Sequence, residues 1–435
     1  MKKYDKYKNS GIEWIGDIPE HWEIKALKHT ANVVLGKMLT NDDKGGYYLK
    51  SYLRAKNIQW GYVNVSDVRK MWFNKKELEL YRLKKNDLVV SEGGEVGRTG
   101  IWLEELNECY LQNSVHKVTV YKHNSSIFFL YQFISFGHRG YFDSMVNRIS
   151  IAHLTKEKLE NLFFLIPPLK EQTQIADFLD EKTAEIDEAI ALKNQLITLL
   201  QEEKSALINE AVTKGIDSTV PMKDSGIEWI GNIPAHWEVW KVARAFQGIS
   251  SGSTPKTDNR DYYKNGTINW INTGDLNNGI LHSCKKRITV KALEDISALK
   301  IYPTGSLIVA MYGATIGKVS ISNIEATTNQ ACCVLPKSNI INSKFAFYWF
   351  IANKKNIINL SVGGGQPNIS QDIVKNLKIS IPFKEEQTKI VNFIESKTQE
   401  IDQEIDYTKE EIALLKEYRQ SLISEAVTGK IDVRK

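Results

Sequence analysis

Cysteine is scarce in this sequence, which has four among 435 residues. No two cysteines form a C-x-x-C pair, and none has a histidine at a spacing that would complete a zinc site. No apolar run approaches the roughly 18 residues that a membrane-spanning helix needs, and the first residues do not resemble a signal peptide. We therefore expect no disulfide framework, no metal site and no membrane partner, and we expect the protein in the reducing cytoplasm.

Signatures of common catalytic sites are also missing. A methyltransferase acting on amino groups needs Asn or Asp before a Pro-Pro-aromatic run, but the single Pro-Pro, at residues 167–168, has neither flank. No segment has the spacing of a phosphate-binding loop, no acidic pair stands with a lysine at nuclease spacing, and no histidine has a recurring acidic partner. We expect no catalytic residue in this chain.

What the chain does contain is a long helical pattern that occurs twice, at residues 170–214 and again at 385–429. Apolar residues recur in alternating steps of four and three, proline precedes each copy, and glycine follows near its end. A helix of roughly 44 residues is a rod of about 66 Å, too long to bury its stripe inside one compact domain, so we expect each copy to pair with the other. The predicted pairing positions are Leu179, Ile186, Ile190, Ile197, Leu200 and Leu207, with Ile394, Ile401, Ile405, Ile412, Leu415 and Leu422 standing 215 residues later.

A second repeated segment lies at residues 10–23 and 225–238, again 215 residues apart. Two tryptophans, a glycine turn and a proline at this density predict an extended segment whose tryptophans pack against a core. The predicted anchors are Trp14, Trp22, Trp229 and Trp237.

The remaining sequence predicts one sheet domain in each half. Length alone allows two or three domains at roughly 150 residues each, and the repeat favours two. Strand patterns at 87–91, 99–103 and 114–120 precede an aromatic helix at 127–134, which has a counterpart at 345–351. The predicted segments are a first domain at 1–165, a first long helix at 166–215, a second domain at 216–380, and a second long helix with its tail at 381–435.

Charge separates the long helices from the domains. Residues 170–214 and 385–429 together carry −11, so the rest of this +5 chain carries +16. A basic surplus confined to the domains suits a nucleic-acid reader, although ordinary surface charge beside acidic helices is the alternative.

Candidate nucleic-acid contacts lie in glycine-rich loops of both halves. In one pair of loops, two glycines separated by three residues precede a cation, which could meet a phosphate or remain solvated. A second pair, at 148–155 and 363–370, supplies amides able to pair with adenine, or forms a turn before a helix. The candidate contacts are Lys37, Thr40, Arg98, Asn113, Arg148, Thr254, Lys256, Lys318, Gln366 and Asn368.

The motifs S-G-I-E-W-I-G-x-I-P-x-H-W-E and I-P-x-x-x-E-Q-T-x-I, each present twice, and the run 251–275 resemble the specificity subunit of type I restriction-modification systems. The resemblance spans essentially the whole chain. It implies an α+β fold with two mixed α/β target-recognition domains in tandem repeat, joined by two long antiparallel helices that form a coiled-coil spacer. Each domain would read one half of a gapped, asymmetric site in double-stranded DNA.

The resemblance also implies partners. Two methyltransferase subunits would use S-adenosylmethionine, and restriction subunits bound through them would use ATP and Mg, while this chain needs no cofactor. Two alternatives remain, a single-chain DNA methyltransferase or nuclease and a scaffold protein that binds only other proteins. Methyl-donor binding by the isolated chain would favour the first, and no DNA affinity even with partners would favour the second.

Overall fold

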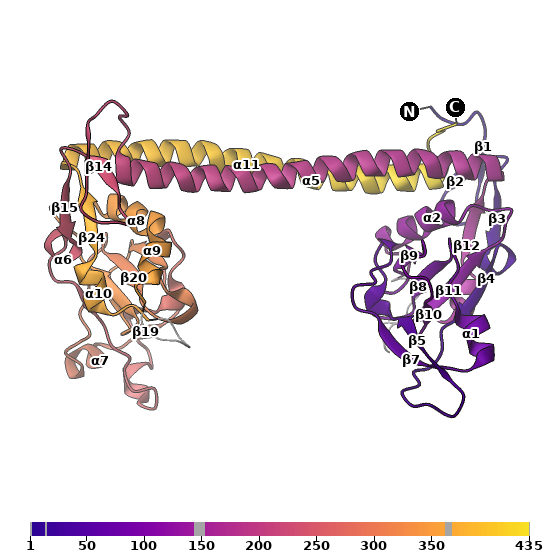
Figure 1. The fold of residues 1–435 in the computed structure, drawn as a ribbon, viewed down its shortest axis with the longest axis horizontal. Coiled ribbons are helices and arrows are strands. Elements are labelled where there is room, and N and C mark those ends of the chain that lie inside the picture. The colour runs from indigo at the N-terminus through magenta and orange to yellow at the C-terminus, as the bar shows by residue number, and fades with distance from the viewer. Residues whose placement is uncertain (1, 14, 143–152, 362–367, 435) are drawn as a thin grey trace. The chain divides into compact units, whose positions relative to one another are not determined.

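The computed structural model describes residues 2–13, 15–142, 153–361 and 368–434 (Figure 1). The chain divides into two compact units. Unit 1 combines Met1–Asn194 with Lys409–Lys435, and unit 2 is Gln195–Thr408. Each unit therefore contains one sheet domain together with part of each long helix.

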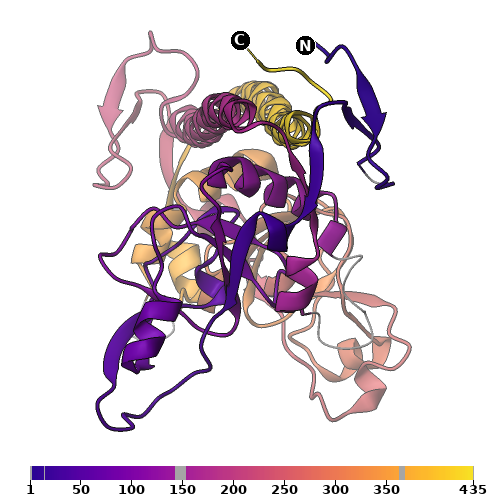
Figure 2. The same cartoon turned by 90° about the vertical axis from the view of Figure 1, so that its right-hand side faces the viewer.

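The two predicted long helices are confirmed as α5 (Leu169–Lys214) and α11 (Lys384–Val427). They run antiparallel within unit 1, because Lys193 and Asp187 of α5 pair with Glu411 and Arg419 of α11 respectively, at 2.7 and 2.9 Å. Figure 2 looks along the two helices and shows them side by side.

Charged residues that interrupt the apolar stripe form repeated ion pairs. Lys204 pairs with Asp402 in unit 2 at 2.6 Å. The matching pair in unit 1 is Arg419 with Asp187, because Arg419 is the counterpart of Lys204 and Asp187 is the counterpart of Asp402 in the 215-residue repeat. All twelve predicted pairing positions of the stripe are buried or half-buried. The buried ones are Leu179, Ile186, Ile394, Ile401, Ile405, Ile412 and Leu422, and the half-buried ones are Ile190, Ile197, Leu200, Leu207 and Leu415.

The first domain has a five-stranded sheet of order β4-β11-β8-β9-β6 and a three-stranded sheet of order β10-β5-β7. Two short pairs, β1-β2 and β3-β12, join it to the helices. Its strands are β1 (Tyr7–Asn9), β2 (Asp17–Pro19), β3 (Glu23–Ala26), β4 (Ala31–Leu35), β5 (Tyr48–Leu53), β6 (Gly61–Tyr62), β7 (Arg69–Phe73), β8 (Leu88–Ser91), β9 (Thr99–Ile101), β10 (Tyr110–Leu111), β11 (Val115–Val120) and β12 (Phe163–Ile166). Its helices are α1 (Lys75–Tyr81), α2 (Ser126–His138) and α4 (Lys156–Glu160).

The second domain repeats this topology strand for strand. Its sheets have the orders β16-β23-β20-β21-β18 and β19-β17-β22, with pairs β13-β14 and β15-β24 toward the helices. Its strands are β13 (Met222–Asp224), β14 (Asn232–Pro234), β15 (Glu238–Lys241), β16 (Ser250–Ser251), β17 (Ile268–Ile271), β18 (Ile280–Leu281), β19 (Arg287–Ile288), β20 (Leu307–Ala310), β21 (Val319–Ser322), β22 (Thr327–Thr328), β23 (Cys332–Leu335) and β24 (Lys378–Ile381). Its helices are α6 (Val242–Ala245), α7 (Val290–Asp295), α8 (Ser343–Ala352), α9 (Lys354–Asn359) and α10 (Gln371–Asn376).

The two repeated sequence motifs bind each other. In unit 1 the Trp22 indole donates to Glu171 of α5 at 3.0 Å, and the His21 ring binds the same carboxylate at 2.8 Å. Trp237 and His236 bind the second copy's glutamate in unit 2 with the same distances. The expectation that no histidine has a recurring acidic partner is therefore wrong, because the two partners lie about 150 residues apart and meet only in the fold.

The predicted tryptophan anchors are partly confirmed. Trp22 and Trp237 are fully buried, and Trp229 is a partly buried residue packed against the core of unit 2. Trp14 lies outside the described residues.

The glutamine that follows this glutamate in each long helix binds the residue that caps the aromatic helix of its domain. The side-chain oxygen of Gln172 accepts from the backbone amide of Ser125, the residue that caps α2, at 2.9 Å. Gln387 accepts from Asn342, which caps α8, at 2.6 Å. Both aromatic helices lie in the core as predicted, since most of their Phe and Trp side chains are buried. Within the described residues no helix is long and apolar enough to cross a membrane.

Candidate nucleic-acid interface

A glycine begins the loop at 36–47 in the first domain and the loop at 252–267 in the second, directly after the first strand of the larger sheet. A Cβ on Gly36 would lie 2.3 Å from the carbonyl oxygen of Gln112, and one on Gly252 would lie 1.7 Å from that of Thr328. Any larger residue would push the loop away from the smaller sheet, because real Cβ contacts to backbone are far longer. Glycine therefore fixes where both loops leave the domain.

In the first domain, Lys37 follows this glycine but points inward. It is 8% exposed, and its ammonium group binds Glu77 of α1 at 2.7 Å beside the ring of Phe73. The neighbouring candidates lie close to it. The Thr40 hydroxyl donates to the carbonyl of Met38 in its own loop at 3.3 Å, and the backbone N–H of Asn113 donates to the carbonyl of Lys37 at 2.9 Å.

The residues after Lys37 are the most exposed apolar ones in that loop. Met38 is 75% exposed and Leu39 is 50% exposed. The sequence interpretation passed over this pair, because apolar side chains carry no charge or amide to mark them. Apolar groups can nevertheless contact thymine methyl groups in the major groove.

In the second domain, two aromatic side chains bind the backbone of the loop after Gly252. The Trp270 indole donates to the backbone carbonyl of Ser253 at 3.1 Å, and the Tyr263 hydroxyl donates to that of Pro255 at 2.6 Å. The Thr254 hydroxyl binds the side chain of Gln330, while Lys256 is exposed. This loop can present a hydroxyl, an amide and a cation on a fixed base.

The candidate cations of the glycine turns differ in their surroundings. Arg98 is held between Glu95, at 2.9 Å, and the carbonyl of Ala55, at 3.0 Å. Lys318, at the matching turn between β20 and β21, is half-buried. The left-handed backbone at Gly94 and Gly313 shapes both turns.

Each glycine turn lies beside the end of the second candidate loop of its domain, at residues 148–155 in the first domain and 363–370 in the second. The backbone N–H of Leu154 donates to the backbone carbonyl of Glu92 at 2.8 Å, and that of Ile369 donates to the backbone carbonyl of Met311 at 2.9 Å. Asn368 is exposed and forms a backbone bridge with Tyr312. Arg148 and Gln366 lie outside the described residues. Two loops that are distant in sequence thus meet at one place in both domains.

A buried histidine supports this junction in the first domain only. The His116 ring binds the carbonyl of Leu154 at 2.7 Å, and burial lowers the pKa of this ring. Strand register places Cys333 at the matching position of the second domain. Burial raises the pKa of that thiol to about 12, so it stays protonated at neutral pH.

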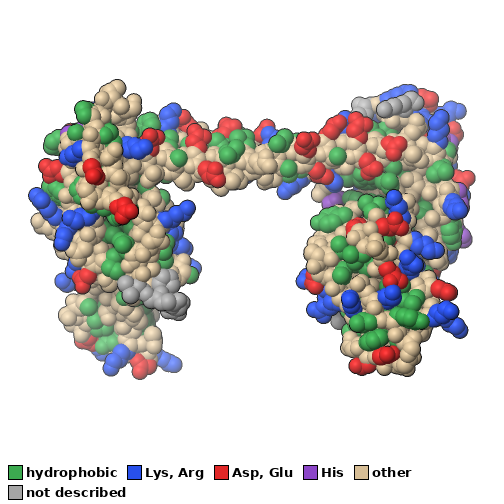
Figure 3. Space-filling model, viewed as in Figure 1, with side chains coloured by type: hydrophobic (Ala, Val, Ile, Leu, Met, Phe, Trp, Pro, Cys, Tyr) green, Lys and Arg blue, Asp and Glu red, His purple; other side chains and the backbone are tan. Residues whose placement is uncertain are grey.

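Lysine and arginine side chains lie among acidic ones over both domains, and acidic side chains recur along the long helices (Figure 3). Exposed cations lie in and next to the smaller sheet of each domain. Exposed lysine and arginine side chains are the groups that proteins use to bind the phosphates of nucleic acids. Among the described residues, no three His, Cys, Asp or Glu side chains gather as metal ligands would. The exposed cations in and next to the smaller sheets include Lys44, Arg69, Lys70, Lys75, Lys76, Lys84 and Lys85 in the first domain, and Lys256, Arg260, Lys264, Lys285, Lys286, Arg287 and Lys300 in the second.

Comparison with known proteins gives one consistent family. The family described as "Type I restriction modification DNA specificity domain" matches residues 19–201 and again residues 234–416. The type I restriction enzyme MjaVIII specificity subunit of Methanocaldococcus jannaschii is 25% identical over 448 residues, which cover 96% of this chain and 94% of that protein.

Two solved structures share the fold. A chain from a study of complex assembly and conformational transition of the type I R-M system has a TM-score of 0.72 at 13% identity, covering 95% of this chain and 99% of that one. The HsdS subunit from Thermoanaerobacter tengcongensis has a TM-score of 0.59 at 14% identity, covering 95% of this chain and 98% of that one.

Proposed function

The chain belongs to the family of type I restriction-modification specificity subunits, and from this premise we propose that its two domains each read one half of an asymmetric, bipartite DNA site. The observation that carries the proposal is one topology, present twice, that displays different side chains on matching loops. Met38 and Leu39 stand in the first domain where Thr254 and Pro255 stand in the second. Because the two domains share a scaffold but carry different side chains on their loops, they should recognise different half-sites.

Exposed lysines and arginines would supply phosphate affinity, and the loop residues would read base edges. Thr254, Lys256 and Asn368 are the candidates whose positions best suit direct contact, because all three are exposed. Lys37 and Arg98 would first have to exchange their carboxylate partners for phosphates. Thr40, Asn113, Lys318, Arg148 and Gln366 remain proposed contacts of the same loops.

We assign residues 1–165 and 216–380 to recognition, and residues 166–215 and 381–435 to a spacer that fixes the gap between half-sites. The same repeat should give two docking sites for methyltransferase subunits, through which restriction subunits bind. On this proposal the chain is not an enzyme and needs no cofactor. S-adenosylmethionine acts in the methyltransferase, and ATP with Mg acts in the restriction subunit. The reducing cytoplasm remains its predicted location.

The proposal is tested by expressing the chain with its methyltransferase subunit and sequencing modified bases. We expect one motif with two unlike halves and a fixed gap. The isolated chain should show no binding of S-adenosylmethionine by calorimetry. Methyl-donor binding by the chain alone would overturn the non-catalytic role.

A further inference from the structure

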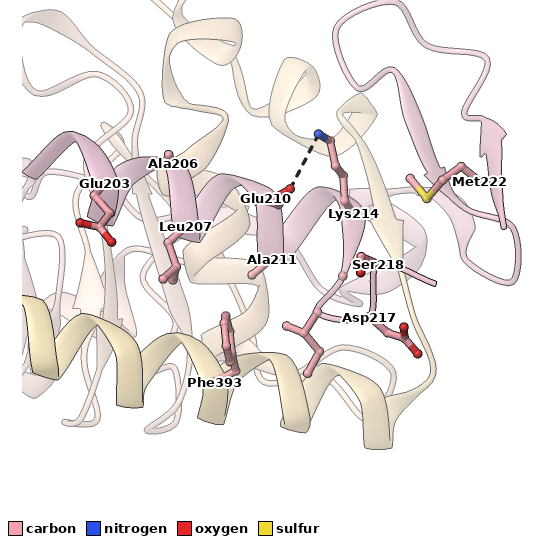
Figure 4. Close-up of a pocket in the computed structure, with 12 residues that line it drawn as sticks. Glu203, Ala206, Leu207, Glu210, Ala211, Lys214, Asp217, Ser218, Met222 and Phe393 are labelled. Atoms are coloured by element: carbon pink, nitrogen blue, oxygen red, sulfur yellow. Dashed lines mark ion pairs between the residues drawn. The ribbon is translucent and has the colours of Figure 1, made fainter. Parts of the chain in front are cut away.

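The two units have similar grooves where the long helices end. In unit 2 a groove of about 590 Å³ follows the last turns of α5, and Leu207 lies across it from Phe393 of α11 (Figure 4). In unit 1 a groove of about 610 Å³ is lined by Glu425, the counterpart of Glu210 in the first groove. Since both units have this groove, it gives the two domains no reason to differ. Features that could distinguish two half-sites lie instead in the loops of the domains.

A short loop joins the smaller sheet to the larger one in each domain. It comprises residues 112–114, between β10 and β11, in the first domain and residues 329–331, between β22 and β23, in the second. In each loop the backbone N–H of the first residue donates to the carbonyl of the last residue of β5 or β17, at 3.1 and 3.0 Å respectively. The second residue is Asn113 in the first domain and Gln330 in the second, so these two side-chain amides occupy matching positions.

Both amides are oriented by a donor that binds their side-chain oxygen. The Thr254 hydroxyl donates to the side-chain oxygen of Gln330 at 2.5 Å. In the first domain the side-chain nitrogen of Gln112 donates to the side-chain oxygen of Asn113 at 2.6 Å. Gln330 is exposed, and within the described part of the chain its side-chain nitrogen has no hydrogen-bond partner. That nitrogen and the second lone pair of the oxygen can therefore bind a ligand.

The loop that carries Thr254 is itself fixed. The backbone carbonyls of the two residues that flank Thr254 accept from the side chains of Trp270 and Tyr263. The backbone N–H of Gly252 donates to the Thr328 hydroxyl, at the end of β22, at 3.2 Å. The hydroxyl is thus held against the strand that leads to the amide. A recognition group that is already in place loses little conformational entropy when it binds.

An oriented amide matches one base in the major groove. Adenine presents the N7 acceptor beside the N6 amino donor, so an amide nitrogen can donate to N7 while the amide oxygen accepts from N6. Guanine presents two acceptors there, N7 and O6, and would place O6 against the amide oxygen. The loop of Thr254 also carries the exposed ammonium group of Lys256, which can bind a phosphate beside the base.

We propose that Gln330 reads an adenine in the half-site of the second domain and that Thr254 positions its amide. This inference rests on the proposed function, because it names the base that one domain recognises and the side chain that recognises it. Gln330 is a specificity-determining residue. Thr254 is a positioning residue for that amide, and its own oxygen can still accept a hydrogen bond.

The test uses the full chain assembled with its methyltransferase subunit and duplexes of the mapped site. Each adenine in the second domain's half-site, in either strand, is replaced in turn by 7-deazaadenine, which has C–H in place of N7 and so lacks that acceptor. We expect one such duplex to bind the wild-type complex roughly tenfold more weakly. The Gln330→Ala complex should bind the unmodified duplex as weakly, and should lose nothing further on the modified one.

Two outcomes would overturn the inference while the proposed function stood. In one, no replacement of adenine weakens binding by wild type. In the other, Gln330→Ala loses as much on the modified duplex as wild type does. If the wild-type complex did not bind its mapped site, the proposed function would fail as well.

Further variants separate base reading from damage to the fold. Thr254→Val removes the hydroxyl at similar volume, so the preference for adenine over 7-deazaadenine should shrink, and Thr254→Ser should restore it. Full preference in Thr254→Val would overturn the positioning role. Gln247→Ala is the matched control, because Gln247 is exposed in the same domain and precedes β16, at the end of the β16-β23 pair away from Gln330. We expect this control to bind every duplex as wild type does.

Discussion

Replacing Gly252 with alanine should disable one half of the recognition site. The added Cβ would lie 1.7 Å from the backbone oxygen of Thr328, a separation that only a shift of the backbone can relieve. The shift would also strain the bond from the Gly252 amide to the Thr328 hydroxyl, now 3.2 Å long. Because Thr254 and Lys256 follow directly, the displaced backbone would carry both of them out of position.

Overpacking of this kind costs about 1–3 kcal/mol. That free energy corresponds to a loss of roughly 5- to 150-fold in the population of the correctly placed loop. The affinity for the half-site read by the second domain should fall by the same factor, while the first domain's half-site keeps its contribution. Gly36→Ala should produce the mirror result, since its Cβ would lie 2.3 Å from Gln112.

The assay is DNA binding by the assembled complex to its mapped site and to two versions in which one half-site is scrambled. Gly274→Ala is the matched control, because Gly274 lies in the same domain and a Cβ added there would meet nothing within 4 Å. We expect that control to bind within about twofold of wild type, as surface substitutions usually do. Full affinity of Gly252→Ala for the intact site would refute the role of this loop, and equal loss at both half-sites would refute independent reading.

Removing one heptad from each long helix, residues 190–196 and 405–411, should shorten the spacer by about 10 Å and the gap by about three base pairs; methylation mapping showing an unchanged gap would rule out the spacer role. Exchanging residues 27–159 for the same segment of another family member should change one half-site only, and a change in both would show that the domains do not read separately. Because burial lowers the pKa of His116, the unfolded first domain binds a proton more readily than the folded one, so its stability should fall as pH drops below about 6.5. His116→Cys, which copies Cys333, should reduce that fall in urea unfolding followed by limited proteolysis, and an unchanged pH dependence would contradict the assignment.

The parts that repeat without insertions are predictable from sequence. The His-Trp-Glu segments and the Glu-Gln-Thr helix entries recur at one offset because they bind each other through Glu171 and Glu386. The heptad-like stripe predicts both long helices to within two residues of their ends. The aromatic helices are identifiable because nearly continuous apolar runs of that length belong in a core.

Three strands of the first domain, β8, β9 and β11, lie where the sequence predicts them. The strand order and the match between the two repeated sheets could not be predicted, because small insertions hide the correspondence. The offset between matching strands is 215 at β3 and β15, rises to 219 at β8 and β20, and returns to 215 at β12 and β24. Long-range pairing decides register in sheets, and local composition does not encode it.

Candidate contacts are the least predictable feature. Lys37 and Arg98 are candidates because they are cations in loops, yet their partners, Glu77 for Lys37 and Glu95 with Ala55 for Arg98, are evident only when the chain is folded. The sequence does carry one marker of the contact loops, a glycine directly after the first strand of the larger sheet in each half, Gly36 and Gly252. Its significance comes from a close approach to a strand far along the chain.

The central claim is that two domains with different DNA specificities are held at a fixed spacing. Its most direct test is genome-wide sequencing of modified bases in cells that express this chain with its methyltransferase subunit. We predict a single motif of two different half-sites separated by an unspecified gap of constant length. A palindromic motif, a continuous motif or a variable gap would contradict the account.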